Sequence, residues 1–287
     1  MLTSRSNIDH FCVFGNKERI ADVLMNLGFV FGNTKSDSLV HVVLEHGYLE
    51  YAEGNDGVPE SNIVPELGRI VTDKPKLFTL WFGVTDAAKV KANFEAEGFN
   101  ISGYRIGTEM RRAKHGVNRG YRGRAGCTRM DKEPFTEVVS GFTQHLKNHL
   151  MYNQQKFIQV NGARSIDGIV FVCEDEKKVK ETNDYFVNAD RIINDLSEDA
   201  TNVRINYYIT RDEYKQIFGK EYSGDRSLDM AAVTLAGGDL IYLKERSEEL
   251  GMNYSIKGRD IYIDATAVLG SFLVFHCDPL FDAIDIR

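Results

Sequence analysis

Apolar residues recur along this chain in two patterns, one typical of strands and one typical of helices. Residues 8–14 form a short apolar run that predicts a strand, and apolar positions at helical spacing over 16–27 predict a helix that stops at Gly28. Three further strand-like runs follow, at 29–31, 39–44 and 47–52. The first unit of the chain is therefore predicted to be a strand, a helix and three strands.

The same order of elements begins three more times. A second unit starts with a strand over 77–84, a third with 165–173 and a fourth with 230–235. A single unit of this kind leaves one face of its sheet uncovered, so we expect units to pair and curl around a shared cup. The pattern predicts an α+β fold of repeated βαβββ modules paired into cup-shaped mixed sheets, with domains at 1–160 and 161–287.

Composition narrows the class of protein. With 43% hydrophobic and 27% charged residues, the chain has the balance of ordinary globular proteins. The net charge of -7 and a pI near 5.6 argue against a general nucleic-acid binder. The four cysteines form no CxxC pair, and the sequence shows no leader segment and no apolar run of bilayer length. We therefore expect a cytoplasmic protein of bacterial style, without nucleic-acid or membrane partners and with a homodimer left open.

A histidine and a glutamate in predicted strands are candidates for a metal site. Successive side chains of a strand point to opposite faces, so His10 is expected on one face with Ile8 and Cys12. By the same rule, Glu50 shares a face with Tyr48. If the first and last strands of the unit lie side by side, an imidazole and a carboxylate meet, which is two-thirds of a facial triad for a divalent metal. The alternatives are a core histidine satisfied by the backbone and an ion pair between Glu50 and an arginine.

A basic segment over 105–132 stands out in this acidic chain, with nine Lys and Arg residues. Four glycines between positions 116 and 126 indicate mobility. We interpret the segment as an electropositive loop that covers the cup and attracts an anionic substrate. The candidate substrate-binding residues are Arg111, Arg112, Arg122 and Arg124. The alternative is a long solvated loop without a role in binding.

Five short motifs carry a resemblance to a known superfamily. They are Ile8-Asp9-His10, Leu27-Gly28-Phe29, Gly47-Tyr48-Leu49-Glu50, Phe142-Thr143-Gln144-His145 and Asn161-Gly162-Ala163-Arg164. In their order and spacing, the chain resembles the vicinal-oxygen-chelate superfamily of glyoxalase I, the extradiol ring-cleaving dioxygenases and the bleomycin-resistance proteins. More narrowly, it is similar to the glyoxalase-like domain proteins of bacteria. One departure is Gln159-Val160, where relatives often carry a histidine and a proline.

In that superfamily, the metal ligands come from the first and fourth strands of each of two paired units. Carried onto this chain, the resemblance implies His10 and Glu50 from the first unit and His145 from the second. His149 is the alternative to His145 if the strand lies elsewhere. The first-strand position of the second unit falls near Thr79, which is a poor ligand.

The C-terminal half lacks histidines at the corresponding places. Gly168 and Ala232 stand at the first-strand positions of its two units, which implies a structural or substrate-shaping role for that half. His41, His46, His115 and His276 have no predicted partner, and a structural or solvated role is the expectation for each.

The resemblance implies a divalent-metal-dependent enzyme, a lyase, isomerase or dioxygenase, that acts on a small oxygenated substrate, anionic if the basic segment binds it, through oxygen chelation. The sequence does not choose among Fe, Mn, Zn, Ni and Co, although two histidines and one carboxylate favour Fe or Mn for oxygen chemistry. The alternative is a metal-free small-molecule binding or sequestering protein of the bleomycin-resistance type. A structural or regulatory dimer is a third hypothesis.

Overall fold

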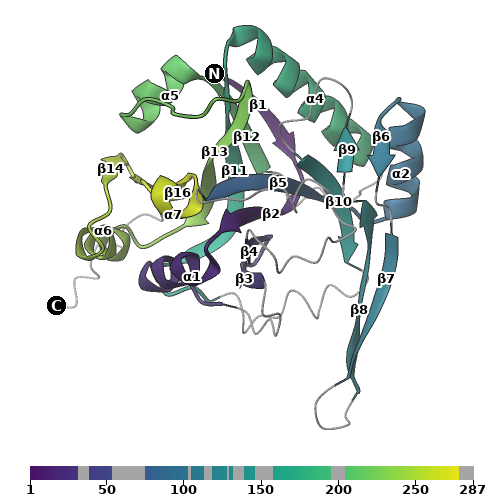
Figure 1. The fold of residues 1–287 in the computed structure, drawn as a ribbon, viewed down its shortest axis with the longest axis horizontal. Coiled ribbons are helices and arrows are strands. Elements are labelled where there is room, and N and C mark those ends of the chain that lie inside the picture. The colour runs from purple at the N-terminus through teal and green to yellow at the C-terminus, as the bar shows by residue number, and fades with distance from the viewer. Residues whose placement is uncertain are drawn as a thin grey trace, which may run out of the picture.

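The computed structural model of this chain contains two seven-stranded mixed sheets and, within the part that it describes, six helices (Figure 1). The described residues are 1–31, 39–53, 75–102, 105–112, 118–127, 129–131, 139–145, 158–194 and 204–277. This architecture confirms the predicted α+β fold of repeated βαβββ modules. No helix in these ranges is both long enough and apolar enough to span a bilayer.

The N-terminal sheet places two units symmetrically about its centre. Its strand order is β3 (Leu39–Val43), β4 (Tyr48–Glu53), β2 (Ile8–Gly15), β5 (Lys76–Gly83), β10 (Val139–His145), β8 (Asn118–Cys127) and β7 (Arg105–Arg112). The central strands β2 and β5 are antiparallel, and β4 and β10 lie parallel to them on either side. The last strand of each unit therefore lies beside its first strand. Helices α1 (Lys17–Asn26) and α2 (Ala87–Ala96) follow β2 and β5, and β6 (Asn100–Ser102) pairs separately with β9 (Arg129–Asp131).

The C-terminal sheet repeats this arrangement and takes its edge strand from the N-terminus of the chain. Its order is β1 (Leu2–Ser6), β12 (Arg204–Thr210), β11 (Ala163–Cys173), β13 (Leu228–Gly237), β16 (Phe272–His276), β15 (Asp260–Ile263) and β14 (Tyr254–Lys257). Its helices are α4 (Glu176–Asn194), α5 (Arg211–Phe218), α6 (Leu240–Glu249) and α7 (Thr266–Leu269). Strand β1 pairs antiparallel with β12, in the place that β3 holds beside β4 (Figure 1). The sequence pattern of the third unit did not predict a strand at this edge.

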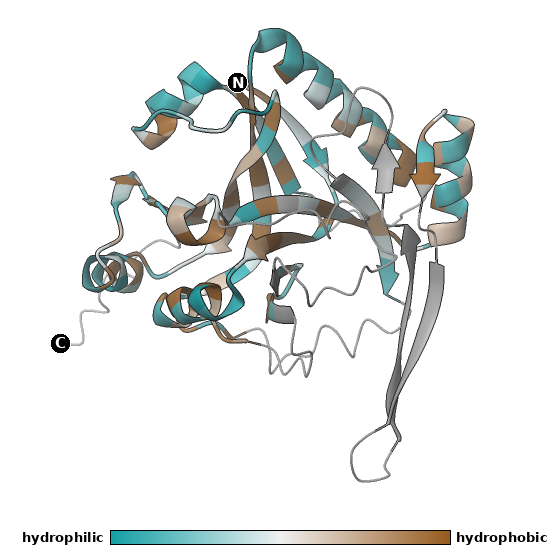
Figure 2. Ribbon diagram, in the orientation of Figure 1, coloured by the Kyte–Doolittle hydropathy of each residue, from teal (hydrophilic) through white to brown (hydrophobic). Residues whose placement is uncertain are grey.

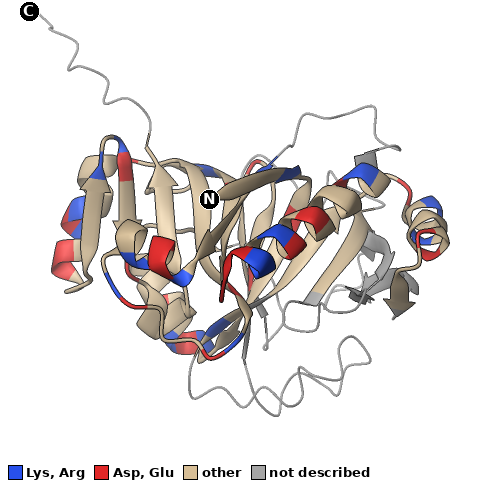
Figure 3. Cartoon of the chain, turned by 90° about the horizontal axis from the view of Figure 1, so that it is seen from above, with Lys and Arg blue, Asp and Glu red and all other residues tan. Residues whose placement is uncertain are grey.

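Apolar residues of both sheets pack into one shared core. The ring centroids of Phe82 and Phe186 lie 6.0 Å apart, as do those of Phe29 and Phe275, and each pair joins the two halves of the chain. Figure 2 shows apolar stretches along the central strands, and Figure 3 shows the charged residues gathered mainly on the helices. The helices therefore carry the solvent-facing charge of the molecule.

Helix α5 covers part of the other face of the C-terminal sheet. Tyr214 and Phe218 belong to a second, smaller apolar cluster with Val170 and Phe272. The rings of Phe218 and Phe272 lie 4.5 Å apart between their centroids. Apolar side chains of the protein therefore fill this part of the face. The corresponding face of the N-terminal sheet carries several polar side chains among its described residues instead.

Two sequence motifs pack against each other at the junction of the halves. Gly28, which follows α1, has φ = 83°, and a Cβ at this position would lie 2.7 Å from the Tyr242 ring. The buried Asn161 side chain donates a hydrogen bond of 3.0 Å to the carbonyl of Leu27. The motifs that contain Gly28 and Asn161 are therefore explained by packing and hydrogen bonding at this junction.

Gly28→Ala is expected to destabilise the fold by about 3 kcal/mol, because it combines a left-handed backbone with overpacking. Gly251→Ala is the matched control: Gly251 has φ = 63°, but nothing lies within 4 Å of an added Cβ. The control should cost only about 1 kcal/mol, from the backbone conformation alone. Urea unfolding of the two variants measures the difference, and equal losses would contradict the packing argument.

The strand predicted at 29–31 does not form. The Phe29 N–H donates to the carbonyl of Leu24, and the Val30 N–H donates to Gln159 Oε1 at 2.7 Å. The Gln159 amide also donates to the carbonyl of Val43 at 3.1 Å. The backbone groups that a strand would use are thus taken by the end of α1 and by Gln159. Gln159, which stands where relatives often carry a histidine, therefore links the residues after α1 to the end of β3.

The described residues of the basic segment lie in strands, most of them in a β-hairpin, so the prediction of a loop is wrong for 105–112, 118–127 and 129–131. Strands β7 and β8 are antiparallel, with Gly107 opposite Arg124 and Thr108 opposite Gly123 (Figure 1). Pairing with a neighbouring strand outweighs the low strand propensity of glycine here. The backbone positions of Arg111, Arg112, Arg122 and Arg124 lie in these strands, whereas their side chains lie outside the described part of the structure.

Candidate metal centre

A β-bulge in β2 places two polar side chains beside each other. In the pairing of β2 with β5, Ile8 lies opposite Phe82 and His10 lies opposite the next residue, Trp81. Asp9 is therefore the extra residue of the bulge. Ile8 belongs to the main core cluster with Phe11. The expectation that His10 shares a face with Ile8 is therefore wrong, because strict alternation does not hold across a bulge.

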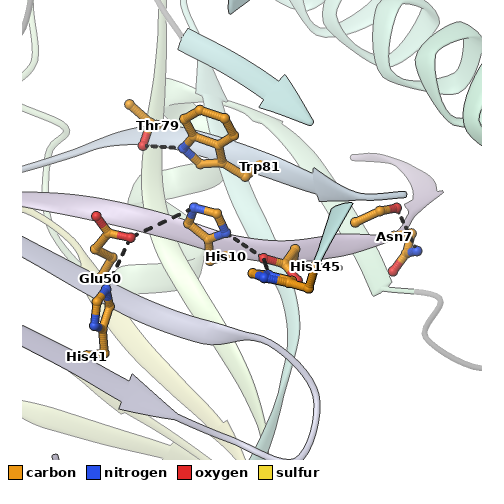
Figure 4. A network of polar contacts seen from close by, with 9 residues as sticks. Asn7, His10, His41, Glu50, Thr79, Trp81 and His145 are labelled. Carbon is orange, nitrogen blue, oxygen red and sulfur yellow. Dashed lines mark hydrogen bonds and ion pairs between the residues drawn. The ribbon is translucent and has the colours of Figure 1, made fainter. Parts of the chain in front are cut away.

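His10 is held in place on three sides. Its ring stacks on Tyr48, with 4.2 Å between centroids, and on Trp81, at 5.3 Å. Its Nδ1 lies 2.6 Å from Asp9 Oδ2, and the side chain is only 1% exposed. These contacts direct the other ring nitrogen, Nε2, toward Glu50, at 3.9 Å from Oε2 (Figure 4).

Asp9 joins two histidines. Burial alone raises the pKa of its carboxyl group, but the charge of His145 and hydrogen bonds from His10 and His145 outweigh it, so the pKa lies far below its usual range. An ionised carboxylate only accepts hydrogen bonds, so His10 donates from Nδ1. The Nε2 atom of His145 lies 3.0 Å from the same oxygen, Oδ2. Asp9 thus fixes which nitrogen of His10 carries the proton.

Glu50 faces a second histidine that sequence reasoning left without a partner. His41 on β3 stands directly opposite Glu50 on β4, and its Nε2 lies 3.3 Å from Glu50 Oε2. The edge of the His41 ring also meets Tyr48, at 5.4 Å between centroids. The short turn at 44–47 was the available signal, because it fixes which residues of β3 and β4 lie opposite each other.

The structure brings together some of the predicted site residues and separates others. Strands β2 and β4 lie side by side, which was the condition for the predicted pair, and His10 and Glu50 face each other. His145 reaches this group through Asp9. Thr79 is buried and accepts a hydrogen bond of 3.3 Å from the Trp81 indole. Among the described residues, no three His, Cys, Asp or Glu side chains have the compact arrangement of a formed metal site.

The C-terminal sheet has the same register without these side chains. Gly168 pairs with Thr234 and Ile205, as His10 pairs with Trp81 and Tyr48. A Cβ at Gly168 would lie 1.8 Å from the Ile205 carbonyl oxygen, so no larger residue fits. The equivalent of the His10 position therefore cannot hold a ligand in this sheet.

Comparison with known proteins gives matches in structure alone. No family model and no curated protein matches the sequence. A Mn(II)-bound glyoxalase from Novosphingobium aromaticivorans is similar with a TM-score of 0.52 and 7% identity, over 96% of this chain and 84% of that one. Homoprotocatechuate 2,3-dioxygenase from Brevibacterium fuscum, in complex with 3,4-dihydroxyphenylacetate, has a TM-score of 0.51 and 10% identity, over 96% and 82% of the chains.

A third match is longer than this chain. It is a xylose isomerase-like TIM barrel/4-hydroxyphenylpyruvate dioxygenase fusion protein, with a TM-score of 0.53 and 9% identity over 95% of this chain. This chain spans about half, 49%, of the fusion protein. The chain therefore shares the fold of these glyoxalase and dioxygenase structures, as its motifs predicted.

Proposed function

We propose that this chain is a divalent-metal-dependent enzyme that binds a small oxygenated organic substrate through neighbouring oxygens. One observation carries the proposal: the buried His10 donates Nδ1–H to Asp9 and directs Nε2 toward Glu50. Histidines that bind metals commonly donate their other N–H to a carboxylate in this way. His10 and Glu50 are the proposed ligands, and His145 belongs to the same site through Asp9.

The donor atoms fit a divalent ion. Bonds from Zn²⁺ to nitrogen or carboxylate oxygen are about 2.0–2.2 Å, so adjacent ligands lie about 2.8 to 3.6 Å apart. The separation of 3.9 Å between His10 Nε2 and Glu50 Oε2 is slightly longer, and a rotation of the Glu50 carboxylate can take up the difference. Imidazole and carboxylate donors suit Fe and Mn, and imidazole also suits Zn, Co and Ni. These residue types do not select one of these metals.

The protein side chains have separate tasks in the proposed reaction. A bound ion would supply Lewis acidity that polarises substrate oxygens. Tyr48 and Trp81 stack on both faces of the His10 ring and keep its orientation, which limits reorganisation during the reaction. His145 is more exposed than His10, at 14% against 1%, and so lies nearer the approach of a substrate.

A screen with added metals tests this function. Purified protein, prepared without chelator or nickel affinity, is incubated with diols, thiol hemiacetals and lactones in the presence of Mn, Fe, Co, Ni or Zn. We expect turnover that depends on the metal and is lost in His10→Ala. Ligand binding of equal strength with and without metal, and without turnover, would instead support a metal-free sequestering protein.

The four arginines of the hairpin are proposed to attract an anionic substrate. Arg124 stands directly opposite His145 in the pairing of β8 with β10, so the basic hairpin begins at the candidate site. Positive charge beside a site raises the rate at which anions associate, most strongly at low salt.

Replacing Arg111, Arg112, Arg122 and Arg124 together with Gln is therefore expected to raise KM for an anionic substrate about tenfold at low salt, without loss of folding. The control replaces four exposed lysines on the helices with Gln, Lys177, Lys180, Lys215 and Lys244, and makes the same change in net charge. Steady-state kinetics across a salt series measure both. Equal effects in the two variants would show that the arginines have no local role.

A further inference from the structure

The C-terminal sheet carries a polar cluster on the face that corresponds to the candidate site. Asp167 is the extra residue of a bulge in β11, as Asp9 is in β2. Tyr207 stands at the register position of Glu50, on the strand that lies parallel to the bulged one. His276 of β16, the counterpart of β10, contacts Asp167. The bulged aspartate and its histidine are therefore common to both sheets, whereas a tyrosine replaces the proposed glutamate ligand here.

His276 lies between two carboxylates. Its Nε2 atom is 3.3 Å from Asp167 Oδ2, and its Nδ1 atom is 3.0 Å from Oδ1 of Asp260, the residue directly opposite it on β15. No lysine or arginine among the described residues makes an ion pair with either aspartate. An imidazole carries at most one positive charge, so the cluster keeps negative charge when both carboxylates are ionised. Its charge therefore favours a cation.

Two tyrosines adjoin the aspartates. Burial, followed by the charges of Asp167 and Asp260, raises the pKa of Tyr207. Burial, followed by the charge of Asp260, also raises the pKa of Tyr262. Both hydroxyls therefore stay protonated at neutral pH, and the rings offer electron-rich faces to a cation. The Lys257 ammonium already makes such a contact, at 5.2 Å from the centroid of the Tyr262 ring, which leaves the Tyr207 ring for a ligand.

Solvent reaches this part of the face, unlike the part under α5. The side chains of Asp167, Asp260 and His276 are each between 31% and 33% exposed. Ile205, which precedes Tyr207 by two residues on β12, is 38% exposed. A small molecule in solution can therefore approach the charged side chains directly.

One buried polar group at this face lacks a partner. The Thr234 side chain is 3% exposed, and its Oγ1 has no hydrogen-bond partner among the described residues. It lies beside the cluster, because a Cβ on Gly168, the residue after Asp167, would be 3.2 Å from Oγ1. An unsatisfied buried hydroxyl costs free energy, which a hydrogen bond from a ligand would recover. We propose that Asp167, Asp260 and Tyr207 form a second ligand site, for a small protonated amine with an apolar body.

An ammonium group matches the acceptors of the cluster. Each aspartate contacts His276 through one oxygen and keeps its second oxygen for a ligand. A primary ammonium has three N–H donors, enough for one oxygen of each aspartate and for Thr234 Oγ1. The candidate metal centre, in contrast, adjoins the basic hairpin, which is proposed to attract an anion. The two sites therefore differ in the charge of the ligand that they take.

Calorimetric titration of the whole chain with benzylamine, at neutral pH and in the presence of a chelator, tests the second site. Benzylamine is protonated under these conditions, benzyl alcohol is its neutral match, and benzoate is the anionic one. Benzylamine is expected to bind at least about tenfold more tightly than benzyl alcohol, because its hydrogen bonds to the carboxylates are charge-assisted. Benzoate should show no binding. The chelator keeps the candidate metal centre out of the measurement.

Substitutions locate the bound amine. Asp167→Asn should weaken benzylamine binding about tenfold, and Tyr207→Leu about threefold. Tyr207→Phe keeps the ring and should match wild type. Two controls should leave binding unchanged: Asp184→Asn, at an exposed aspartate on α4, and Glu50→Gln, at the candidate metal centre.

A wild type that binds benzylamine no better than benzyl alcohol would overturn the inference, and the cluster would then serve only to link β11, β16 and β15. Binding that is lost in Glu50→Gln and kept in Asp167→Asn would overturn it as well. Should Asp167→Asn not fold, as judged by circular dichroism, Asp260→Asn is expected to show the same tenfold loss of about one order of magnitude. None of these results depends on a metal, so failure of this inference leaves the proposed function standing.

Discussion

Glu50→Gln is expected to remove tight metal binding while the protein stays folded. Glu50 Oε2 is the atom that His10 Nε2 faces, so the substitution takes away the negative charge of one of the two proposed ligands. Gln keeps the volume of the side chain but is a poor metal donor, and the affinity for Mn²⁺ or Zn²⁺ should fall by at least about 100-fold. Equilibrium dialysis measures the affinity, and circular dichroism follows the fold.

The control for this variant is Glu95→Gln, which changes an exposed glutamate that pairs with Lys91 on α2. It should leave metal affinity unchanged and alter stability by less than about 0.5 kcal/mol. If Glu50 served only as a partner in a buried ion pair, Glu50→Gln would change stability and leave metal binding as it was. An affinity equal to that of wild type would exclude Glu50 as a ligand.

Asp9→Asn is expected to weaken metal binding about 10- to 100-fold and to destabilise the apoprotein by about 3 kcal/mol. Asp9 accepts from His10 at 2.6 Å and contacts His145 at 3.0 Å, and it is buried. Both contacts are to Oδ2, which the amide oxygen of an asparagine can replace, but the amide carries no negative charge, so both hydrogen bonds become weaker. The proton on His10 Nδ1 is then held less strongly, and Nε2 is less firmly fixed as the ligand nitrogen.

Asp184→Asn provides the comparison for Asp9→Asn. Asp184 is 58% exposed on α4 and pairs with Lys180, so its loss should change stability by less than about 0.5 kcal/mol and leave metal affinity unaltered. Thermal unfolding and metal titration are measured on both variants. A variant at Asp9 that binds metal as well as wild type would show that the carboxylate does not position His10.

The spacing of apolar residues correctly predicted those strands and helices whose formation depends on the local sequence. The strand at residues 8–14 and the helix that stops at Gly28 are observed, with Asn16 as the cap that accepts from the Arg19 N–H at 2.8 Å. The adjacency of β2 and β4, which brings His10 toward Glu50, was the condition on which the predicted pair depended, and it is observed. Local signals therefore identified His10 and Glu50 but did not by themselves place them side by side.

Three features required information that alternation along one strand does not contain. The bulge at Asp9 is visible only as a register shift against β5. The position of His41 depends on the pairing of β3 with β4. The edge strand β1 pairs with a strand about 200 residues away, Leu2 with Tyr208, which only the tertiary structure decides.

For the hairpin of β7 and β8, the local sequence predicted a loop where the structure has strands. Its glycines and charges are depleted in strands on average, so a loop was the reasonable prediction. In the structure, β8 pairs with β10 and β7 pairs with β8, and those backbone hydrogen bonds override the local preference. The arginines proposed to bind substrate thus stand on paired strands.

The most direct test of the metal site is the stoichiometry of wild-type protein reconstituted separately with Mn, Fe, Co, Ni and Zn. The protein is purified without chelator or nickel affinity, dialysed against each metal and measured by elemental analysis. The account predicts about one equivalent of at least one of these metals, with His10→Ala and Glu50→Gln close to zero. Less than about half an equivalent of every metal in the wild type, or equal amounts in wild type and variants, would contradict it.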